Sequence, residues 1–458
     1  MKFASCILKT AICIALDIVF TLSVVSPSED VTKLTQFGCR WFGGIVGMVS
    51  CNCTSDAEEM YIEPNSIPGF DTSIIEINRC PKVRFAPHSI SDLRNLRRVS
   101  LNSIASVSFE ESSMNWYGYR DVGGQEERFD LTVPSLKVIL RNCVVEKIAS
   151  QAFSGRINEI SFEDVTVDAV DSFAFSNLLQ TENVAFKYTT FKDVKPQAFK
   201  KFGTEYLTLD GVSAYFVPSR TFSNVSVHQR FSIINSNLES VRPGAFFIYN
   251  PSTFEVINTR ISQLDGEAFK VMTRGDVVFR NNVFNDIHEG AFVGIRLNRA
   301  EVTGSHSITF DSNTFSTLRS GSLQVVGFDT RFANLNVNQS CDCELVEDLQ
   351  LTQFFNDVRC LNDDVYVTVR DYASRSCSVV AGYTTVIVIT CVVILAVALA
   401  LIGLYVYYKT VYLSKKYETD KVRNNPGKIS LIVPDGKTYK ETEIHVILEK
   451  ADLLTTEL

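Results

Sequence analysis

An apolar pattern recurs every 22 to 24 residues through the middle of this chain, and it constrains the fold more than any other feature of the sequence. An aromatic residue marks the pattern and usually follows alanine, as in Ala152-Phe153 and Ala198-Phe199. A fixed period of this length is typical of a solenoid, in which each repeat packs only against its neighbours. The marker positions are Phe153, Phe175, Phe199, Phe222, Phe246, Phe269 and Phe292, with Leu323 after a longer gap.

Each repeat also begins with two apolar residues separated by one residue. Side chains at this spacing point to the same face of a short strand. A single repeat cannot bury that face alone, so the repeats are expected to stack and align their strands into a parallel sheet. The second apolar residue of each pair precedes the marker by thirteen positions, at Leu140, Phe162, Phe186, Leu209, Ile233, Val256, Phe279 and Phe310.

These repeats resemble extracellular leucine-rich repeats. The segments VVFRNNVFNDIHEGAF (277–292) and FSIINSNLESVRPGAF (231–246) carry the resemblance, and NVNQSCDCELVEDL (336–349) is similar to the cysteine-rich flank that follows such repeats. The resemblance covers about residues 39–377. It implies an α/β-type solenoid, a horseshoe with short parallel strands, irregular return arms and disulfide-rich caps, with one transmembrane helix beyond it. It implies no cofactor and no bound metal.

One position departs from the family pattern in most repeats. The family places Asn three residues after the second apolar position of the strand, and we call this the ladder position. Only Asn282 and Asn313 match, so several other turns must satisfy their backbone groups in another way. The residues at the ladder position are Cys143, Val165, Thr189, Val212, Ser236, Thr259, Asn282 and Asn313. A right-handed parallel β-helix is the alternative solenoid, and such folds often carry polysaccharide-cleaving enzymes.

Cysteines form two groups of four that bracket the repeats. In an exported chain this arrangement predicts disulfides at both ends, with the connectivity left open. Two zinc sites are the alternative. Cys143 lies alone at a ladder position and is predicted to be a buried free thiol, with intermolecular pairing as the alternative. The eight cysteines assigned to disulfides are Cys39, Cys51, Cys53, Cys80, Cys341, Cys343, Cys360 and Cys377.

Two hydrophobic segments predict a single-pass membrane protein. Residues 1–26 have the charged start, apolar middle and small-residue end of a signal peptide. The uncharged run from Thr384 to Tyr405 is long enough, at about 33 Å, to cross a bilayer. Lysines and arginines from Lys409 onward favour a cytoplasmic tail, so the N-terminus is expected outside the plasma membrane.

The predicted organisation therefore has six parts. A signal peptide (1–26) is followed by an N-terminal cap (27–83), repeats (84–335) with an insert near 110–131, a C-terminal cap (336–380), a transmembrane helix (384–408) and a tail (409–458).

Charged residues on the outward side of the strands are the candidate binding site. They flank or separate the two apolar residues of each strand, and their mixed sign favours a protein partner over a polyanion. A solvated, solubilising surface is the alternative. The candidate partner-binding residues are Arg141, Glu163, Lys187, Asp210, Arg230, Glu255 and Arg280. Asn52, Asn224 and Asn338 begin N-x-S/T sequons and are candidate glycosylation sites.

The tail carries two short motifs. Thr456 to Leu458 matches the C-terminal pattern that PDZ domains bind as an added strand. Glu449, Leu453 and Leu454 match a sorting signal recognised by clathrin adaptors. Incidental occurrence is the alternative for both.

Composition and motifs exclude other functions. The net charge of -8 is spread along the chain, so nucleic-acid binding is not expected. No motif of a zinc protease, serine hydrolase or phosphate-binding loop is present, so we expect no enzyme. The sequence predicts a cell-surface protein that binds an extracellular protein in an adhesion or receptor role and couples to cytoplasmic adaptors. The alternatives are a matrix-organising surface glycoprotein and a membrane-anchored β-helix carbohydrate-active enzyme.

Overall fold

The computed structural model describes residues 34–44, 46–53, 59–69, 72–117, 135–299, 304–377, 379–412 and 415. The chain divides into two compact units, Met1–Cys377 and Ser378–Leu458. The predicted signal peptide at 1–26 and the two predicted tail motifs lie outside the described residues.

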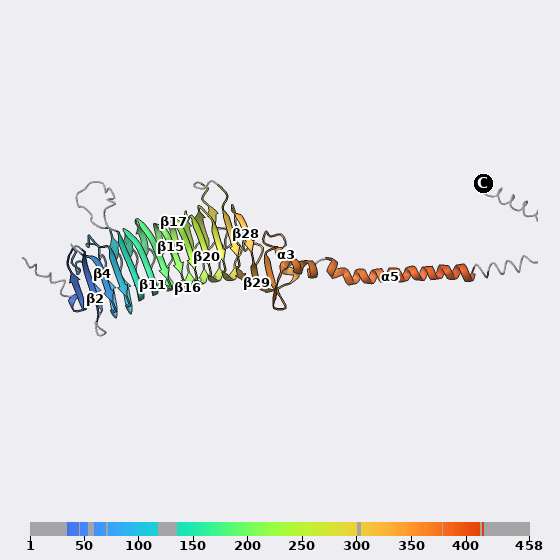
Figure 1. The fold of residues 1–458 in the computed structure, drawn as a ribbon, viewed down its shortest axis with the longest axis horizontal. Helices are drawn as coiled ribbons and strands as arrows, with labels where there is room; N and C mark the ends of the chain where they lie inside the picture. The colour runs from blue at the N-terminus through green and yellow to red at the C-terminus, as the bar shows by residue number, and fades with distance from the viewer. Residues whose placement is uncertain are drawn as a thin grey trace, which may run out of the picture. The chain divides into compact units, whose positions relative to one another are not determined.

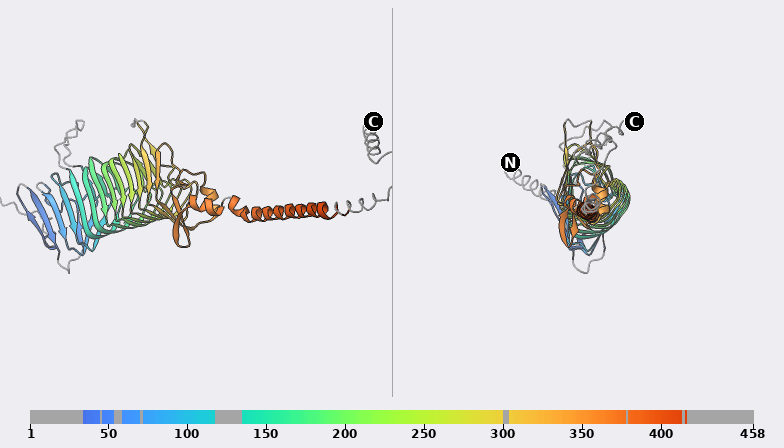
Figure 2. Two further views of the ribbon diagram at one scale, coloured as in Figure 1. Left: turned by 45° about the vertical axis from the view of Figure 1, so that its right-hand side comes forward. Right: turned by 90° about the vertical axis from the view of Figure 1, so that its right-hand side faces the viewer.

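The first unit is a parallel-strand solenoid, as the repeat predicts, and successive turns stack along one axis (Figures 1 and 2). Its first ladder contains the strands with two inward apolar residues. Pairing is parallel and in register, for example Ile160↔Val184 and Phe162↔Phe186. These strands are β2 (Gly47–Asn52), β4 (Thr72–Asn78), β6 (Arg98–Asn102), β9 (Leu136–Ile148), β11 (Ile157–Val170), β13 (Thr181–Lys187), β15 (Phe199–Asp210), β17 (Phe222–Ile234), β20 (Thr253–Ile257), β23 (Val277–Arg280), β26 (Ser307–Asp311) and β28 (Asp329–Ala333).

The return arms are more regular than we expected, because they form two further parallel ladders. Strands β9 and β11 are long enough to belong to the first and second ladders, and β15 and β17 to the third and first. The other second-ladder strands are β3 (Met60–Ile62), β5 (Lys82–Phe85), β7 (Ser106–Phe109), β14 (Thr190–Val194), β16 (Ser213–Val217), β18 (Asn237–Val241), β21 (Arg260–Leu264), β24 (Val283–Ile287), β27 (Thr314–Phe315), β29 (Leu335–Ser340) and β30 (Val358–Asn362). The other third-ladder strands are β8 (Met114–Trp116), β10 (Phe153–Gly155), β12 (Phe175–Leu178), β19 (Phe246–Tyr249), β22 (Phe269–Thr273) and β25 (Arg296–Leu297).

The core is a column of stacked phenylalanine rings. The marker residues of consecutive turns lie face to face, with ring centroids 4.6 Å apart for Phe175 and Phe199 and 4.4 Å for Phe199 and Phe222. All of these rings are buried. The aromatic marker in the sequence therefore corresponds to one continuous contact along the inside of the solenoid.

The turn before each phenylalanine marker has a left-handed backbone. Its φ is 55° at Gln151, 65° at Phe173 and 61° at Gln197, although glycine occupies the same position in other repeats, as Gly244 does. The Gln151 N–H donates to the Phe173 carbonyl at 2.9 Å, and the Phe173 N–H to the Gln197 carbonyl at 2.8 Å. This hydrogen bonding between turns offsets the conformational cost of a left-handed non-glycine residue.

Three boundaries differ from the prediction. The first ladder already includes β2 and β4, so the repeated turns begin before residue 84; these turns lack the Ala-Phe marker. At the other end, β29 and β30 continue the second ladder beyond residue 335. The insert begins only after Tyr117, because β8 pairs with β10 and the buried Trp116 Nε1 donates to the Leu93 carbonyl at 2.7 Å. Residues 118–134 lie outside the described part of the chain.

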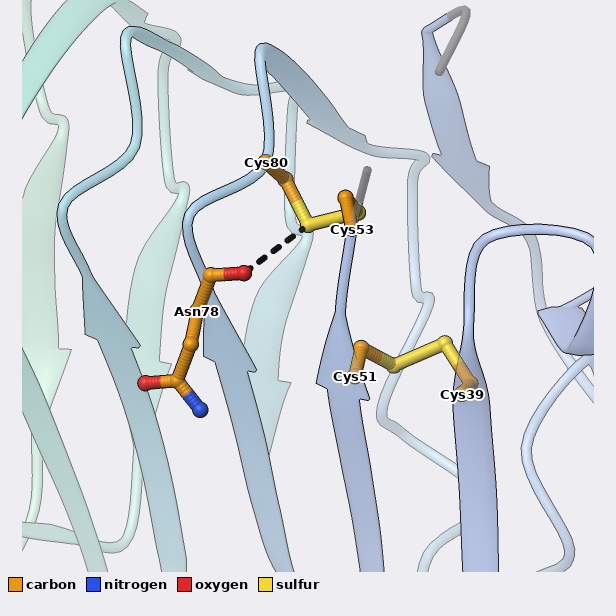
Figure 3. Close-up of a disulfide and its surroundings, with 5 residues drawn as sticks. All are labelled: Cys39, Cys51, Cys53, Asn78 and Cys80. Carbon is orange, nitrogen blue, oxygen red and sulfur yellow. Dashed lines mark hydrogen bonds between the residues drawn. A yellow bond between two sulfur atoms is a disulfide. The ribbon is translucent and has the colours of Figure 1, made fainter. Parts of the chain in front are cut away.

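Each end of the solenoid contains two disulfides. At the N-terminal end, β1 (Cys39–Phe42) pairs antiparallel with β2, and the bonds are Cys39–Cys51 and Cys53–Cys80 (Figure 3). At the other end, β31 (Val365–Thr368) pairs antiparallel with β30. The bonds there are Cys341–Cys360 and Cys343–Cys377, around α3 (Cys343–Leu349), α4 (Val369–Tyr372) and η1 (Ala373–Cys377).

The second unit contains the long helix α5 (Val379–Tyr407), which is followed by the π-helical η2 (Tyr408–Tyr412). Residues Val386–Val411 form a segment of 26 residues that contains an 18-residue window with a mean hydropathy of 3.2, long and apolar enough to cross a membrane. This agrees with the predicted span at 384–408 and is compatible with a single-pass membrane protein.

Candidate functional site

The outward side of the first ladder is one continuous surface made of three rows, which we call the outer strand face. Residues in a row are register partners on neighbouring strands. The leading row contains Lys137, Glu159, Asn183, Tyr206, Arg230 and Thr253. The central row contains Ile139, Ser161, Ala185, Thr208, Ser232, Glu255 and Val278. The trailing row contains Arg141, Glu163, Lys187, Asp210, Ile234, Ile257, Arg280 and Asp311.

The structure places all seven predicted partner-binding residues on this face. Arg141, Glu163, Lys187 and Asp210 are consecutive members of the trailing row, where positive and negative charges alternate. Arg280 lies further along the same row. In the other two rows, Arg230 and Glu255 lie on the neighbouring strands β17 and β20.

Several of these charges interact with each other. The Arg141 Nε lies 3.1 Å from Glu163 Oε2, and the Arg280 Nε lies 3.6 Å from Asp311 Oδ2. The Arg230 Nε lies 3.9 Å from Glu255 Oε1. The arginine of each pair is exposed, and ion pairs at a surface stabilise a fold by about 0–1 kcal/mol each, so they leave the arginines available to another molecule.

For two members of the trailing row, Lys187 and Asp210, the structure shows no ion pair among the described residues. Asp210 Oδ1 accepts a hydrogen bond from Asn235 Nδ2 at 2.9 Å. Lys187 lies between Glu163 and Asp210 in register, and its side chain is exposed. Lys187 is therefore the member of the row best placed to meet a partner's carboxylate.

Two exposed tyrosines were missed by the sequence analysis, one on this face and one in the turn beside it. Tyr188 is 60% exposed and directly follows Lys187, while Tyr206 is 44% exposed in the leading row. Tyr188 has φ of 49° at a turn position where later repeats have Asn235, Asn258 and Asn281. A tyrosine in an asparagine or glycine position is the signal that would have identified it.

The Tyr188 ring lies against the next turn. A Cβ on Gly211 would come within 2.6 Å of Tyr188 Cδ1, and the φ of Gly211 is +66°. Glycine therefore provides both the left-handed turn and the space for the ring. The adjacent second ladder contributes two more exposed aromatics, Tyr215 and Phe216.

The ladder position is satisfied by side chains in the later turns. Asn282 Oδ1 accepts the Thr259 N–H at 2.9 Å, and Asn282 Nδ2 donates to the Val256 carbonyl at 2.8 Å. Hydroxyls do the same in two repeats, since Ser236 Oγ accepts the Val212 N–H and Thr259 Oγ1 accepts the Ser236 N–H. Serine and threonine thus replace the expected asparagine.

Cys143 is a buried free thiol, as predicted. It is 3% exposed, and its Sγ–H has the Arg141 carbonyl within 3.1 Å. Burial raises the pKa of this thiol. The group is therefore held in its protonated form.

The predicted glycosylation sites lie at the surface. Asn52, Asn224 and Asn338 are all exposed, and Asn338 Oδ1 accepts a hydrogen bond from the Tyr366 hydroxyl. Among the described residues, no group of three or more His, Cys, Asp or Glu side chains is arranged to hold a metal ion.

The stacked parallel turns, their period and the side-chain ladder form a solenoid that is consistent with leucine-rich repeats. Residues 128–210 and 192–321 match the family model for the BspA type leucine-rich repeat region, with six copies. This match favours leucine-rich repeats over the parallel β-helix, which shares the stacking of parallel ladders. No curated protein matches the chain.

Proposed function

We propose that this leucine-rich-repeat protein is a cell-surface receptor or adhesion molecule whose outer strand face binds an extracellular protein. Helix α5 anchors it in the plasma membrane, the disulfide-bonded ends cap the solenoid outside the cell, and residues 409–458 contact cytoplasmic adaptors. The chain performs no catalysis itself. Leucine-rich repeats are well suited to this role because a stack of strands presents an extended surface to a partner.

The group formed by Lys187, Tyr188 and Tyr206 is the observation that carries this proposal. Tyrosine is enriched where binding energy concentrates in protein interfaces, and a neighbouring charge adds specificity. Tyr188 also has a left-handed backbone that costs about 1–2 kcal/mol in a residue with a Cβ, and such strain is often retained at functional positions.

Charge reversal on the outer strand face tests the proposal. Cells displaying the full chain with Lys187→Glu and Arg230→Glu are expected to bind partner-bearing cells about tenfold less than cells with the unaltered chain, because both positive charges are lost from one face. The measurement is two-colour cell aggregation at equal surface expression.

The matched control is Lys192→Glu with Arg260→Glu, which makes the same charge change on the second ladder. Aggregation with the control should equal that of the unaltered chain. Equal aggregation by both double variants, or a loss with the control alone, would reject the outer strand face as the binding surface.

Topology is tested separately on intact cells. An epitope placed after residue 26 should be accessible to antibody without permeabilisation, and an epitope after Leu458 only after it. The reverse pattern would contradict the proposed orientation.

A further inference from the structure

A hollow on the third ladder combines features that the repeat architecture does not require. It has a volume of about 280 Å³ and lies over β10, β12 and β15, away from the rows of the outer strand face. We call it the lysine hollow. Its lining residues are Gln151, Phe173, Ser176, Asn177, Lys200 and Lys201.

Ser176 has a buried hydroxyl with no hydrogen-bond partner. The residue is 5% exposed, and its Oγ is one of the buried polar atoms left without a partner. One turn earlier, the equivalent Ser154 Oγ donates to the Gln151 carbonyl at 3.3 Å. A buried polar group without a hydrogen-bond partner lowers the stability of the fold. The Ser176 hydroxyl is therefore available to donate a hydrogen bond to a ligand.

Two lysines lie beside this hydroxyl, and none of the residues that line the hollow is an aspartate or glutamate that could neutralise them. Lys200 is the register partner of Ser176, and its Nζ donates to Gln197 Oε1 at 2.7 Å and lies 4.4 Å from the Phe173 ring centroid. Both of these partners are uncharged, and the side chain of Lys201 is exposed.

Six other lysines of the solenoid differ in this respect. Each of the following lies within 3.5 Å of a carboxylate oxygen: Lys82, Lys137, Lys147, Lys192, Lys195 and Lys270. Lys270 is the closest match to Lys200, because it has the same position on the third ladder three turns later and pairs with Glu267. The lysine hollow therefore has an excess of positive charge that the equivalent Lys270 site lacks.

The positive charge of the hollow favours a negatively charged ligand, and the volume of the hollow indicates how large that ligand can be. A water molecule occupies about 30 Å³ in the liquid, so about 280 Å³ holds more than one small ion. The exposed amides of Gln151 and Asn177 add donors at the rim, and the Phe173 ring adds an apolar surface. This combination fits an oxyanion attached to a sugar-sized group.

We propose that the lysine hollow binds a tetrahedral oxyanion ester, a sulfate or phosphate group carried by a sugar unit, through Lys200, Lys201 and the Ser176 hydroxyl. The oxyanion takes the place of Gln197 as the partner of Lys200 and accepts a hydrogen bond from the Ser176 hydroxyl. The site is separate from the protein-binding face and does not depend on the function proposed for that face.

Binding to the full chain in neutral detergent tests this site. Microscale thermophoresis is performed with galactose 6-sulfate, glucose 6-phosphate, sodium sulfate and unmodified galactose. We expect at least one of the two esters to bind at millimolar concentration and galactose not to bind. Equal affinity for sodium sulfate and the better ester would support an oxyanion site whose ligand is the free ion. Absence of binding by all three anions, or equal binding of galactose, would overturn the proposal.

Substitutions then locate the binding. Lys200→Met with Lys201→Met should weaken ester binding by about tenfold or more, and Ser176→Ala by about threefold, because they remove the charges and the donor. Ser176→Ala removes a hydroxyl that has no partner, so it should not lower the melting temperature. Lys270→Met is the matched control and should bind the ester as the unaltered chain does. Equal affinity for the double lysine variant and the unaltered chain would overturn the assignment to this hollow.

Discussion

Between Phe153 and Phe222 the marker rings stack with centroids 4.4–4.8 Å apart, whereas between Phe222 and Phe292 their spacing is 5.3–6.3 Å. The residues at the ladder position also differ. They are Cys143, Val165, Thr189 and Val212 in the first region, and the polar residues Ser236, Thr259, Asn282 and Asn313 in the second. We call residues 136–222 the aromatic turns and residues 231–315 the polar-ladder turns.

The two regions satisfy the backbone N–H groups at the ladder position in different ways. In the aromatic turns, β9 and β11 run through the ladder position with their backbones in register, so Cys143 pairs with Val165 as one strand residue with another. In the polar-ladder turns the strands break there, and buried side chains accept the freed N–H groups. Where the strand continues, Cys143 and Val165 occupy the ladder position as paired strand residues. Where it stops, a side chain of the next turn accepts the freed N–H, as Ser236 Oγ does for Val212.

Removal of a marker ring is expected to have the largest effect. Phe175→Ala should lower the free energy of unfolding by about 3–5 kcal/mol, as expected for a fully buried phenylalanine. Phe269→Ala should cost about 0.5–1.5 kcal/mol less, because its neighbours in the column lie further away. Urea unfolding of the full chain in mild detergent, followed by circular dichroism, gives both values. A larger loss for Phe269→Ala would reverse the comparison.

Disruption of the polar ladder should have the next largest effect. Asn282→Ala should cost about 2–4 kcal/mol, because it leaves the Thr259 N–H and the Val256 carbonyl without partners. Hydrogen exchange of the Thr259 amide should accelerate. The matched change Val165→Ala removes an apolar residue at the same position of the aromatic turns, where it should leave exchange of the Cys143 amide slow. Comparable acceleration at both amides would remove the distinction between the two regions.

Cys143 should give the smallest effect on stability. Cys143→Ser is expected to change the free energy of unfolding by less than about 1 kcal/mol, because a hydroxyl can donate to the same carbonyl oxygens. Burial raises the pKa of the thiol, so the folded chain holds this proton to higher pH than the unfolded chain does. The thiol's contribution to stability is therefore lost as the pH rises above its unfolded pKa, and Cys143→Ser should remove this pH dependence.

Alkylation independently measures how accessible and how reactive the Cys143 thiol is. In the folded chain Cys143 should resist iodoacetamide at pH 8.5 and react only after unfolding, since the thiolate is the reactive form. Rapid labelling of Cys143 in the folded chain would contradict both the burial and the raised pKa, whereas labelling at Cys391 would not bear on them.

The sequence predicts the parts of the molecule that depend on periodicity. The spacing of residues such as Phe162 and Phe175 is sufficient to predict the stacked strands, and the strand alternation places Arg141 to Arg280 on one face. The pairing of the cysteines is not predictable in this way, because four cysteines permit three connectivities. The earliest turns were missed because the strands at Val49 and Ile75 lack the marker.

The sequence predicted the charged residues of the candidate site but not its exposed tyrosines. Tyr188 lies at a turn where the pattern expects asparagine or glycine, and its exposure depends on the next turn, where Gly211 gives it space. The lysine hollow was missed for a related reason. Ser176 and Lys200 are 24 positions apart in the sequence and become neighbours only through the register of β12 and β15.

The proposed function rests on the outer strand face as the surface that binds an extracellular protein. Photocrosslinking on intact cells tests it most directly, with benzoylphenylalanine at position 208 in the central row of that face and at position 270 on the third ladder. We predict a discrete crosslinked adduct from position 208, which is lost when Lys187→Glu and Arg230→Glu are added, and no adduct from position 270. An adduct from position 270 alone, or the same adduct from both positions, would contradict it.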